Sequence, residues 1–443
     1  MNPTYNVTIE SVDVSGNGIA RIDGKTVFVP DTLPTEEVKI EIYKKKKNFD
    51  FGRVIEIITT SPDRVTPECK NFGVCGGCSL QHIEFKAQVN NKEKVLVDNL
   101  KHIGKVTASN ILPALYGKPW EYRYRARLSV KYVAKKGGVL VGFREKGAPF
   151  VVDMNECLVL PKRISNLIPK LRDVLATLSI KDKIPQIEVA CSDQVDALVF
   201  RILENLSSVD IAILKDFTDQ VNTNNPSQQL QIWLQPGNEE TIVQFYPEPN
   251  TKTLSYTLPE FKLTMPFLPS EFTQVNPYIN QDMVSQAVKL LEIKPTDKIL
   301  DLFCGIGNFT LAIATKALSV TGIEGSDKLI NRALENATLN NLHAKADFIA
   351  MDLFKVTSEY LAELEKYDKW LIDPPRDGAF ELVKTITPDI APELIVYISC
   401  NPSTLARDAD ILVNTHGYKL ANAGVMNMFP HTSHIESIAV FRI

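Results

Sequence analysis

The sequence of 443 residues predicts an α/β protein in three parts: a small N-terminal β-barrel, a strand-rich central domain and a doubly wound C-terminal domain. Three patterns along the chain support this prediction. Short strands with tight turns fill the first 60 residues, and a second strand-rich region runs from Tyr122 to about residue 265. Beyond it, strands alternate with helices. We expect domains at residues 1–60, 61–270 and 271–443.

The first part contains about five apolar strands in fewer than 60 residues. They are expected at residues 7–12, 20–22, 25–29, 38–43 and 51–58. The turn Asp23–Gly24 separates two of them, and Asp-Gly between apolar runs is a strong hairpin signal. Several short strands in so short a segment are typical of a small barrel of the oligonucleotide-binding kind.

The central part begins after a proline-containing linker at residues 61–67. Residues 84–103 carry an imperfect apolar stripe, which predicts a helix, and we expect the helical region to reach about residue 118. The remaining elements are strands at residues 123–133, 139–143, 186–190 and 197–202, and a helix with a strand within residues 206–236.

The C-terminal part has the rhythm of a parallel, doubly wound sheet. Its strands are expected at residues 298–303, 319–324, 346–350, 369–373 and 394–399, with helical stretches between them. In such sheets ligands bind at the carboxyl ends of the strands. Polar residues that follow these strands are therefore the first candidates for a site.

Composition places the chain among ordinary soluble globular proteins, with 44% hydrophobic and 23% charged residues. No apolar run approaches the roughly 20 residues that span a bilayer. The N-terminus has neither the charged nor the apolar segment of a secretory signal. We therefore expect a cytoplasmic protein that does not contact membranes.

The net charge of −4 conceals an asymmetry. Residues 1–150 hold 24 Lys+Arg and 16 Asp+Glu, a net of +8, whereas the remainder has a net of −12. A basic first third on an acidic body predicts a polyanionic partner for the first third. The alternative is an uneven distribution of solvated charge.

A glycine-containing loop between the first C-terminal strand and its helix indicates a nucleotide cofactor. In Asp301–Phe309, Gly305 and Gly307 let the backbone approach a ligand closely. Glu324, 23 residues after Asp301, ends the next strand, where an acid suits ribose hydroxyls. The loop lacks the third glycine of a pyrophosphate site, so S-adenosylmethionine fits it better than NAD.

A plain strand–helix turn is the alternative explanation of this loop. Acidic residues recur at the same predicted sheet edge, with Asp352 after the third strand and Asp373 after the fourth. That recurrence favours a ligand site.

Cys400 lies in Tyr-Ile-Ser-Cys-Asn-Pro, 27 residues after Asp373 in the run Asp-Pro-Pro-Arg376. This pattern indicates methyl transfer to carbon, because a thiolate added to C6 of uracil makes C5 nucleophilic enough to attack a methylsulfonium. The chemistry needs a cysteine of lowered pKa, a hydrogen-bond donor near O4 and a base that removes the C5 proton. Glu436, before the last strand, is the candidate base.

The alternative for Cys400 is a buried apolar side chain, and for Glu436 a solvated strand end. Asp-Pro-Pro also occurs in amino methyltransferases, which usually carry an aromatic residue after the prolines. Arg376 in that place favours a carbon atom over an exocyclic nitrogen as the atom that receives the methyl group.

Four of the seven cysteines have the spacing of metal ligands. Cys69, Cys75 and Cys78 lie within ten residues, and Cys157 supplies a fourth thiol. Four thiolates suit either an iron–sulfur cluster or zinc, and the spacing leaves the two metals open.

Together these residues resemble the RNA uracil-C5 methyltransferase family, in particular its 23S ribosomal RNA branch. The most specific motifs are Cys-x5-Cys-Gly-Gly-Cys-Ser-Leu-Gln81, Phe272-Thr-Gln-Val-Asn276, Asp301–Phe309, Asp-Pro-Pro-Arg and Ser-Cys-Asn-Pro. The resemblance extends over nearly the whole chain. It implies an N-terminal TRAM domain, a central iron–sulfur domain onto whose helix the catalytic domain packs, and a Rossmann-like methyltransferase domain.

The resemblance also implies roles for individual residues. It makes Cys400 the nucleophile and Glu436 the base, places Gln274 between cofactor and target base, and counts Asp373 and Gln274 as catalytic residues too. It assigns the S-adenosylmethionine site to Gln274, Phe303, Asn308, Glu324, Asp352 and Asp373. It assigns a 4Fe–4S cluster, structural or RNA-binding in role, to Cys69, Cys75, Cys78 and Cys157.

The implied partner is 23S ribosomal RNA, in which one uridine is methylated to 5-methyluridine. We expect the enzyme to be a monomer without an obligate protein partner. Lys44 to Lys47 and the arginines 123, 125 and 127 are expected to contact phosphates; the alternative is that they face solvent. A rival within the family is a transfer RNA enzyme, a branch that generally lacks the barrel and the cluster cysteines. Another rival is a non-catalytic RNA-binding or RNA-folding protein.

Overall fold

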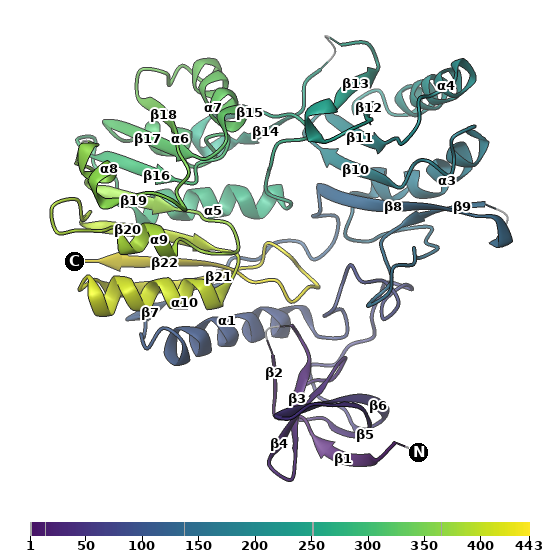
Figure 1. Cartoon of the computed structure of the whole chain (residues 1–443), viewed down its shortest axis with the longest axis horizontal. Helices are drawn as coiled ribbons and strands as arrows, with labels where there is room; N and C mark the ends of the chain where they lie inside the picture. Colours follow the sequence, from purple (N-terminus) through teal and green to yellow (C-terminus); the bar gives the residue numbers. More distant parts are fainter. Residues whose placement is uncertain (1, 14, 137, 250–251, 365) are drawn as a thin grey trace.

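The computed structural model describes residues 2–13, 15–136, 138–249, 252–364 and 366–443. In Figure 1 the chain forms three bodies: a small barrel at the bottom, a central sheet at the right and a large α/β body at the left. No helix in these described ranges is long and apolar enough to cross a membrane.

The N-terminal barrel has six strands, because the stretch expected at residues 7–12 is divided into two. The strands are β1 (Thr4–Thr8), β2 (Ser11–Val12), β3 (Gly18–Ile22), β4 (Lys25–Val29), β5 (Glu37–Lys45) and β6 (Phe49–Thr59), in the order β1-β5-β6-β4-β3-β2. Alternate residues such as Val27, Val38 and Ile40 are fully buried and form its own small core.

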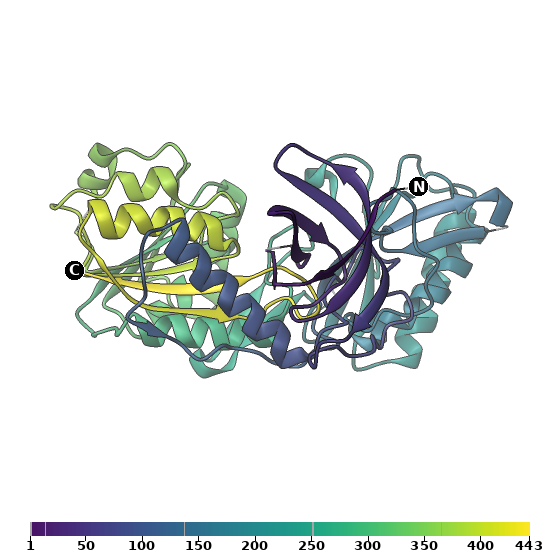
Figure 2. The same cartoon turned by 90° about the horizontal axis from the view of Figure 1, so that it is seen from below.

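Helix α1 (Phe85–His102) follows the barrel and is shorter than the helical region expected to reach residue 118. Gly104 stops it at a close approach, where an added Cβ would lie 2.6 Å from the carbonyl oxygen of Ala406. The chain then extends, and strand β7 (Asn110–Ile111) pairs in parallel with β21 (Lys419–Met426) of the C-terminal sheet. Figures 1 and 2 show α1 lying along the α/β body, against β21 and helix α10 (Pro402–Asp410).

The central body is a six-stranded sheet with helices on one side. Its order is β13-β12-β11-β10-β8-β9. The strands are β8 (Arg125–Val133), β9 (Gly138–Gly142), β10 (Gln186–Cys191), β11 (Val195–Arg201), β12 (Gln229–Gln235) and β13 (Val243–Tyr246). The helices are α2 (Lys162–Ser165), α3 (Leu167–Thr177) and α4 (Ser208–Asn224), and a hairpin of β14 (Ser255–Leu258) and β15 (Leu263–Pro266) leads to the last body.

The C-terminal body is an eight-stranded sheet of order β18-β17-β16-β19-β20-β22-β21-β7. Its strands are β16 (Lys298–Leu302), β17 (Ser319–Glu324), β18 (Ala346–Ala350), β19 (Lys369–Ile372), β20 (Leu394–Ser399), β21 (Lys419–Met426) and β22 (Glu436–Arg442). The five expected strands are confirmed as a parallel set, to which β22 and β21 add antiparallel pairing.

Helices cover both faces of this sheet and leave one edge free for a site. They are α5 (Pro277–Leu290), α6 (Thr310–Ala314), α7 (Asp327–Leu339), α8 (Ser358–Glu363), α9 (Phe380–Lys384) and α10 (Pro402–Asp410). Each face has its own buried cluster, one around Ile299 and Val396, the other around Trp370 and Tyr397. The strand order reverses on either side of β16, and in such sheets ligands bind at the carboxyl ends of the strands beside this point, here β16, β17 and β19.

Candidate active site and cysteine-lined cavity

The loop after β16 has the conformation of a ligand cradle. Phe303, Gly305 and Gly307 all have positive φ angles, of 67°, 56° and 88°. At Phe303, which has a side chain, such a φ is unusual and marks a tightly determined turn. The Glu324 carboxylate at the end of β17 accepts hydrogen bonds from Gly305 N and Ser326 N, each at 3.2 Å.

Asp301 fixes the base of this loop. Its side chain is fully buried, and Oδ2 accepts a hydrogen bond of 2.5 Å from Thr310 Oγ1 at the start of α6. Burial raises the pKa of the Asp301 carboxyl to about 7. Oδ1 has no hydrogen-bond partner. Sequence reasoning quoted Asp301 within the loop motif but gave it no role.

Asn308 belongs to a polar cluster that sequence reasoning did not find. Its Oδ1 accepts hydrogen bonds from Tyr256 Oη at 2.8 Å and from Asn280 Nδ2 at 3.1 Å. Both of these residues, with Gln274, line a small cavity beside the loop. Tyr256 and Asn280 come from a hairpin and a helix outside the loop motif, and no local pattern marked them.

Asp352 is the expected cofactor residue that is least engaged with the others. It lies beyond the carboxyl end of β18 and is exposed, and its carboxylate pairs with Lys355 Nζ at 2.8 Å. The Phe303 ring contacts that of Phe354, two residues after Asp352, with the ring centroids 5.7 Å apart. Asp352 and Phe303 therefore lie at the same edge of the sheet.

Strand pairing brings Cys400 and Glu436 together. Ser399 at the end of β20 pairs with Ser437 of antiparallel β22, so Cys400 and Glu436 are next in register. Residues directly opposite in such a ladder have Cα atoms roughly 4.5–5.5 Å apart. Asp373 follows β19, the other neighbour of β20, and its backbone N donates to Leu302 O. Three of the four expected catalytic residues thus meet at one sheet edge, and the fourth, Gln274, lines the small cavity with Tyr256 and Asn280.

The acids at this edge favour their neutral forms. Burial raises the pKa of Asp373 to about 7, with a smaller contribution from the Asp301 charge. Burial and the nearby Asp373 raise the pKa of Glu436 well above its usual range, and Arg376 opposes the shift. Glu436 is only 4% exposed.

The thiol of Cys400 is not pre-ionised, which differs from the lowered pKa that sequence reasoning required. Burial, with the Glu436 and Asp373 charges, raises its pKa to about 11, while Arg376 lowers it. The N-terminus of α10 does lie next to it, capped by the Asn401 side chain, which accepts from Ser403 N at 3.1 Å. That dipole is outweighed by burial in the ligand-free chain.

Arg376 is oriented by the segment that precedes Glu436. Its Nη2 lies 3.1 Å from His434 Nδ1, and its backbone oxygen accepts hydrogen bonds from Asn401 and Thr404. The guanidinium is the cation whose charge acts on both Cys400 and Glu436.

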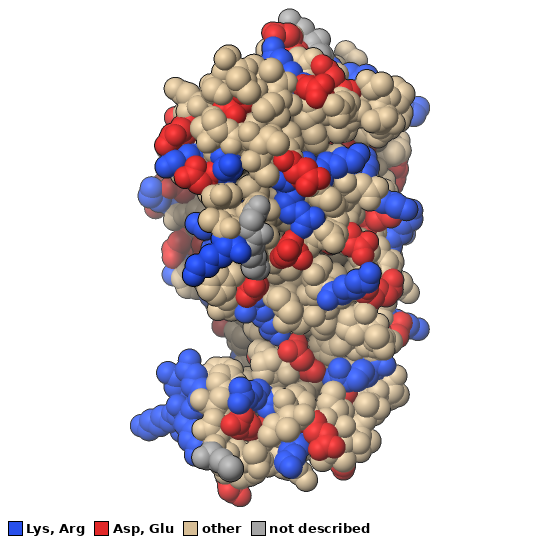
Figure 3. Space-filling model, turned by 90° about the vertical axis from the view of Figure 1, so that its right-hand side faces the viewer, with Lys and Arg blue, Asp and Glu red and all other residues tan. Residues whose placement is uncertain are grey.

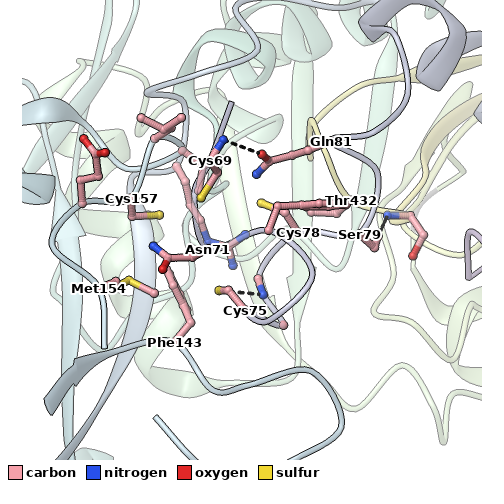
Figure 4. Close-up of a pocket in the computed structure, with 18 of the residues that line it drawn as sticks. Cys69, Asn71, Cys75, Cys78, Ser79, Gln81, Phe143, Met154, Cys157 and Thr432 are labelled. Atoms are coloured by element: carbon pink, nitrogen blue, oxygen red, sulfur yellow. Dashed lines mark hydrogen bonds between the residues drawn. The ribbon is translucent and has the colours of Figure 1, made fainter. Parts of the chain in front are cut away.

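A second cavity, of about 340 Å³, is lined by Cys69, Cys75, Cys78 and Cys157. Figure 4 shows the four cysteines surrounding one space. Burial raises the pKa of the Cys78 thiol to about 11 and that of Cys157 to about 12. One buried and three partly buried thiols around one space are typical of a metal site, because a metal supplies the charge that lets them ionise.

In the described part of the chain, no three Cys, His, Asp or Glu side chains form a group that could hold a metal ion. The four thiols line one cavity, and this shared lining is what makes them candidate ligands of one group. The cavity does not distinguish zinc from an iron–sulfur cluster.

The barrel presents a basic and aromatic face. Figure 3 shows Lys and Arg side chains gathered on one side of the barrel, at the bottom of the view. Phe28, Phe49 and Phe51 point away from the barrel core and contact each other, with ring centroids 5.5 to 5.9 Å apart. Exposed Tyr43 adjoins Phe51, over which Lys44 Nζ lies at 5.5 Å.

Two of the three arginines that are expected to contact phosphates have partners within the protein. Arg125 Nη2 donates to the carbonyl oxygens of Pro269 and Glu271, so the expectation is wrong for Arg125. Arg127 pairs with Glu188 at 2.9 Å but stays largely exposed, and Arg123 lines the cysteine cavity, so for these two the expectation stays a prediction. Arg125 and Arg127 lie on the same face of β8, and the sequence does not say which part of that face is covered.

Comparison with known proteins gives two family matches. The model described as tRNA (Uracil-5-)-methyltransferase matches residues 84–442, and the TRAM domain model matches residues 2–55. A protein of Chromobacterium violaceum named 23S rRNA (uracil(1939)-C(5))-methyltransferase RlmD is 52% identical, over 99% of this chain and 85% of its own. A protein of the same name from Nitrosospira multiformis is 50% identical, over 99% and 98%.

Among solved structures, the Pyrococcus abyssi tRNA (uracil-54, C5)-methyltransferase in complex with S-adenosyl-L-homocysteine has a TM-score of 0.74. It is 23% identical and is covered over 100% of its chain, with 99% of this chain matched. At that identity the likeness shows a shared fold.

Proposed function

This chain belongs to the tRNA (uracil-5-)-methyltransferase family, and from that premise we propose that it methylates C5 of a uridine in 23S ribosomal RNA through a bond between Cys400 Sγ and C6. It is a methyltransferase whose methyl donor is S-adenosylmethionine. The observation that carries the proposed mechanism is the register that sets Cys400 beside Glu436, with Asp373 on the neighbouring strand.

Cys400 makes the target carbon reactive. The Sγ–H proton leaves to solvent, the thiolate sulfur forms a bond to C6, and the C5=C6 electron pair moves toward O4 as an enolate. The enolate attacks the methyl group through C5, and the bond between that methyl group and the sulfonium sulfur of the donor breaks. S-adenosylmethionine supplies that methyl group as an electrophilic sulfonium. The target uridine must leave its stack to reach Cys400, because the ring is inaccessible in a helix.

Glu436 completes the reaction as a base. After methyl transfer C5 carries both a methyl group and a proton. The Glu436 carboxylate removes that proton, the electron pair re-forms C5=C6, and the bond to Sγ breaks. The raised pKa of Glu436 makes it a stronger base once it is ionised.

Asp373 and Gln274 are proposed to lie against the uracil edge. A protonated Asp373 donates to a uracil oxygen, which its pKa of about 7 permits near neutral pH. Gln274, in the cavity with Tyr256 and Asn280, lies beside the methyl donor. Arg376 stabilises the anionic forms of Cys400 and Glu436.

The residues of the strand ends are proposed to hold S-adenosylmethionine. Glu324, already an acceptor of Gly305 N, binds the ribose hydroxyls, and the positive-φ loop from Phe303 to Gly307 lets backbone amides approach the ligand. Asn308 and Asp373 flank the methionine end, while Asp352 contributes at the rim of the adenine side, where it is exposed.

We further propose that Cys69, Cys75, Cys78 and Cys157 hold a 4Fe–4S cluster. The cavity that the four thiols share supports this proposal, because four thiolates are the usual ligands of such a cluster. The cluster has a structural role, because Cys69, Cys75 and Cys78 belong to the segment before α1 whereas Cys157 belongs to the central domain. No step of the methyl transfer passes through it.

The barrel is proposed to bind single-stranded RNA. Tyr43 and the three phenylalanines offer faces on which bases stack, and Lys44 to Lys47 lie beside them as phosphate contacts. A cytoplasmic monomer that acts on ribosomal RNA is consistent with this arrangement.

Domain content does not separate the ribosomal from the transfer RNA substrate, contrary to the sequence argument. A structure named as a transfer RNA enzyme matches 99% of this chain. The ribosomal assignment rests instead on relatives of about 50% identity that carry the 23S name.

The substrate is tested by mapping 5-methyluridine in RNA from a strain that lacks this gene. We expect one uridine of 23S ribosomal RNA to lose its methyl group and to regain it when purified protein and S-adenosylmethionine are added. Loss from transfer RNA with an unchanged 23S pattern would overturn the ribosomal assignment.

A further inference from the structure

The hairpin between β21 and β22 carries the proposed base, and its anchors come from segments far away in the sequence. We name residues 427–435 the base loop. It starts directly after Met426, which pairs with Glu436, so any shift of the loop also moves the Glu436 side chain. Its backbone is held by Leu115 O, Tyr122 Oη and Asn276 Nδ2, all outside the hairpin.

Lys92 of helix α1 is the most unusual of these anchors. It is 3% exposed, and its Nζ donates to Asn427 Oδ1 at 2.7 Å and to Phe429 O at 2.9 Å. Burial lowers the pKa of Lys92 to about 7, and no ion pair between Lys92 and a carboxylate is found among the described residues. A buried amine without a counter-ion is costly to stability, so its two hydrogen bonds to one loop call for a functional explanation.

Gln88, one turn earlier on α1, holds the middle of the base loop. Its Oε1 accepts from His431 N at 2.9 Å, and its Nε2 lies 3.2 Å from His431 Nδ1. The same His431 accepts hydrogen bonds at its backbone oxygen from Ser79 N and Leu80 N, both at 2.9 Å. Since Ser79 directly follows Cys78, the base loop is tied to the cysteine-lined segment as well as to α1.

We propose that Lys92 and Gln88 are positioning residues that hold the base loop so that the Glu436 carboxylate faces C5 of the bound uridine. The proposal rests on the proposed function, because it assigns the step that these residues serve. It also gives α1 a role in the reaction, although α1 precedes the methyltransferase sheet by nearly 200 residues.

A displaced base loop affects one half of the reaction more than the other. Formation of the Cys400–C6 bond and methyl transfer depend on Cys400 and the methyl donor. Release depends on removal of the C5 proton by Glu436. A loop that has moved by a fraction of an ångström therefore slows release, and the methylated RNA stays covalently attached to the enzyme.

The experiment compares Lys92→Met and Gln88→Met with Lys94→Met, which removes a lysine that is exposed on the same helix. Single-turnover reactions use a 23S fragment with ordinary uridine and methyl-labelled donor. The rate of methyl incorporation and the fraction of protein attached to RNA on denaturing gels are measured separately. Calorimetric binding of S-adenosylmethionine reports that each variant is folded.

We expect release to slow by about 10- to 100-fold in Lys92→Met, with the attached fraction rising accordingly and the KM for RNA within about twofold. Lys92→Arg, which keeps the donors, should recover part of the release rate, and Lys94→Met should match the wild type. If Lys92→Met does not fold, Gln88→Met carries the same comparison.

Release at the wild-type rate in folded variants would overturn the proposal, as would equal losses in attachment and release. A wild-type protein that forms no methylated RNA at all would instead contradict the proposed function. The two failures are therefore distinguishable in the same experiment.

Discussion

Cys400 and Glu436 face each other at the end of β20 and β22, because each adjoins one residue of the Ser399–Ser437 pair, the last pair of this antiparallel ladder. The strand pairing sets the spacing of nucleophile and base, and the anchors of the base loop hold the segment that leads into Glu436. Such preorganisation suits a reaction in which the same ring first receives the thiolate and later loses a proton.

Glu436→Gln should separate bond formation from release. The amide cannot remove the C5 proton, so we expect the enzyme to methylate about one uridine per molecule and then remain attached to the RNA. Turnover should fall by roughly 10²- to 10⁴-fold, the range of general-base catalysis. Gel-shifted protein carrying labelled methyl is the measurement, and full turnover by this variant would show that another group is the base.

Alkylation of Cys400 should be slow at neutral pH in the ligand-free protein. Below a pKa of about 11 the thiolate fraction rises about tenfold per pH unit, so the rate should climb steadily from pH 7 to 9. Mass spectrometry of the Cys400 peptide after iodoacetamide treatment measures it. A rate that is already flat at pH 8 would mean that the thiol is pre-ionised.

Arg376 should lower the barrier to thiolate formation. Its charge opposes the rise of the Cys400 pKa, so Arg376→Gln should slow alkylation at pH 8 by roughly threefold to tenfold. Arg376→Lys keeps the charge and serves as the matched control. Equal alkylation rates in the wild type, Arg376→Gln and Arg376→Lys would show that the Arg376 charge does not affect the pKa of Cys400.

Metal content should depend on the four cavity cysteines and on no other thiol. Cys78→Ser and Cys157→Ser, purified without oxygen, should lose most of the iron and acid-labile sulfide, whereas Cys191→Ser, another buried thiol, should retain them. Elemental analysis provides the measurement. Stoichiometric zinc in a colourless wild-type protein would replace the cluster by a zinc site.

The barrel face should contribute to RNA affinity through stacking. Tyr43→Ala should weaken binding of a single-stranded 23S fragment by ~1–3 kcal/mol, and Lys45→Gln should reduce the slope of affinity against salt by about 1. Tyr5→Ala, at another exposed tyrosine of the barrel, is the control. Unchanged affinity and slope in the first two variants would exclude this face from RNA binding.

The sequence predicted best where local pattern and fold coincide. Buried strands such as residues 394–399 are recognised by their apolar runs, and parallel topology then brings Glu324, Asp373 and Cys400 to one edge. Each of these residues ends or follows a predicted strand, so the sequence alone places them at the same edge of the sheet.

What the sequence could not give depends on contacts across long separations. Gln88 and His431 are 343 residues apart, and no periodic pattern in the sequence predicts their hydrogen bond. Tyr256 reaches Asn308 from a separate hairpin for the same reason. The raised pKa of Cys400 is likewise a product of burial, which outweighs the helix terminus that the sequence did reveal.

The most direct test of the account is the identity of the atom that bonds to RNA. The protein is incubated with S-adenosylmethionine and a 23S fragment that carries 5-fluorouridine at the target, where fluorine replaces the proton that Glu436 would remove. We expect a stable adduct whose RNA-linked peptide contains Cys400, and none with Cys400→Ala. An adduct on another residue, or methyl transfer by Cys400→Ala, would contradict the mechanism.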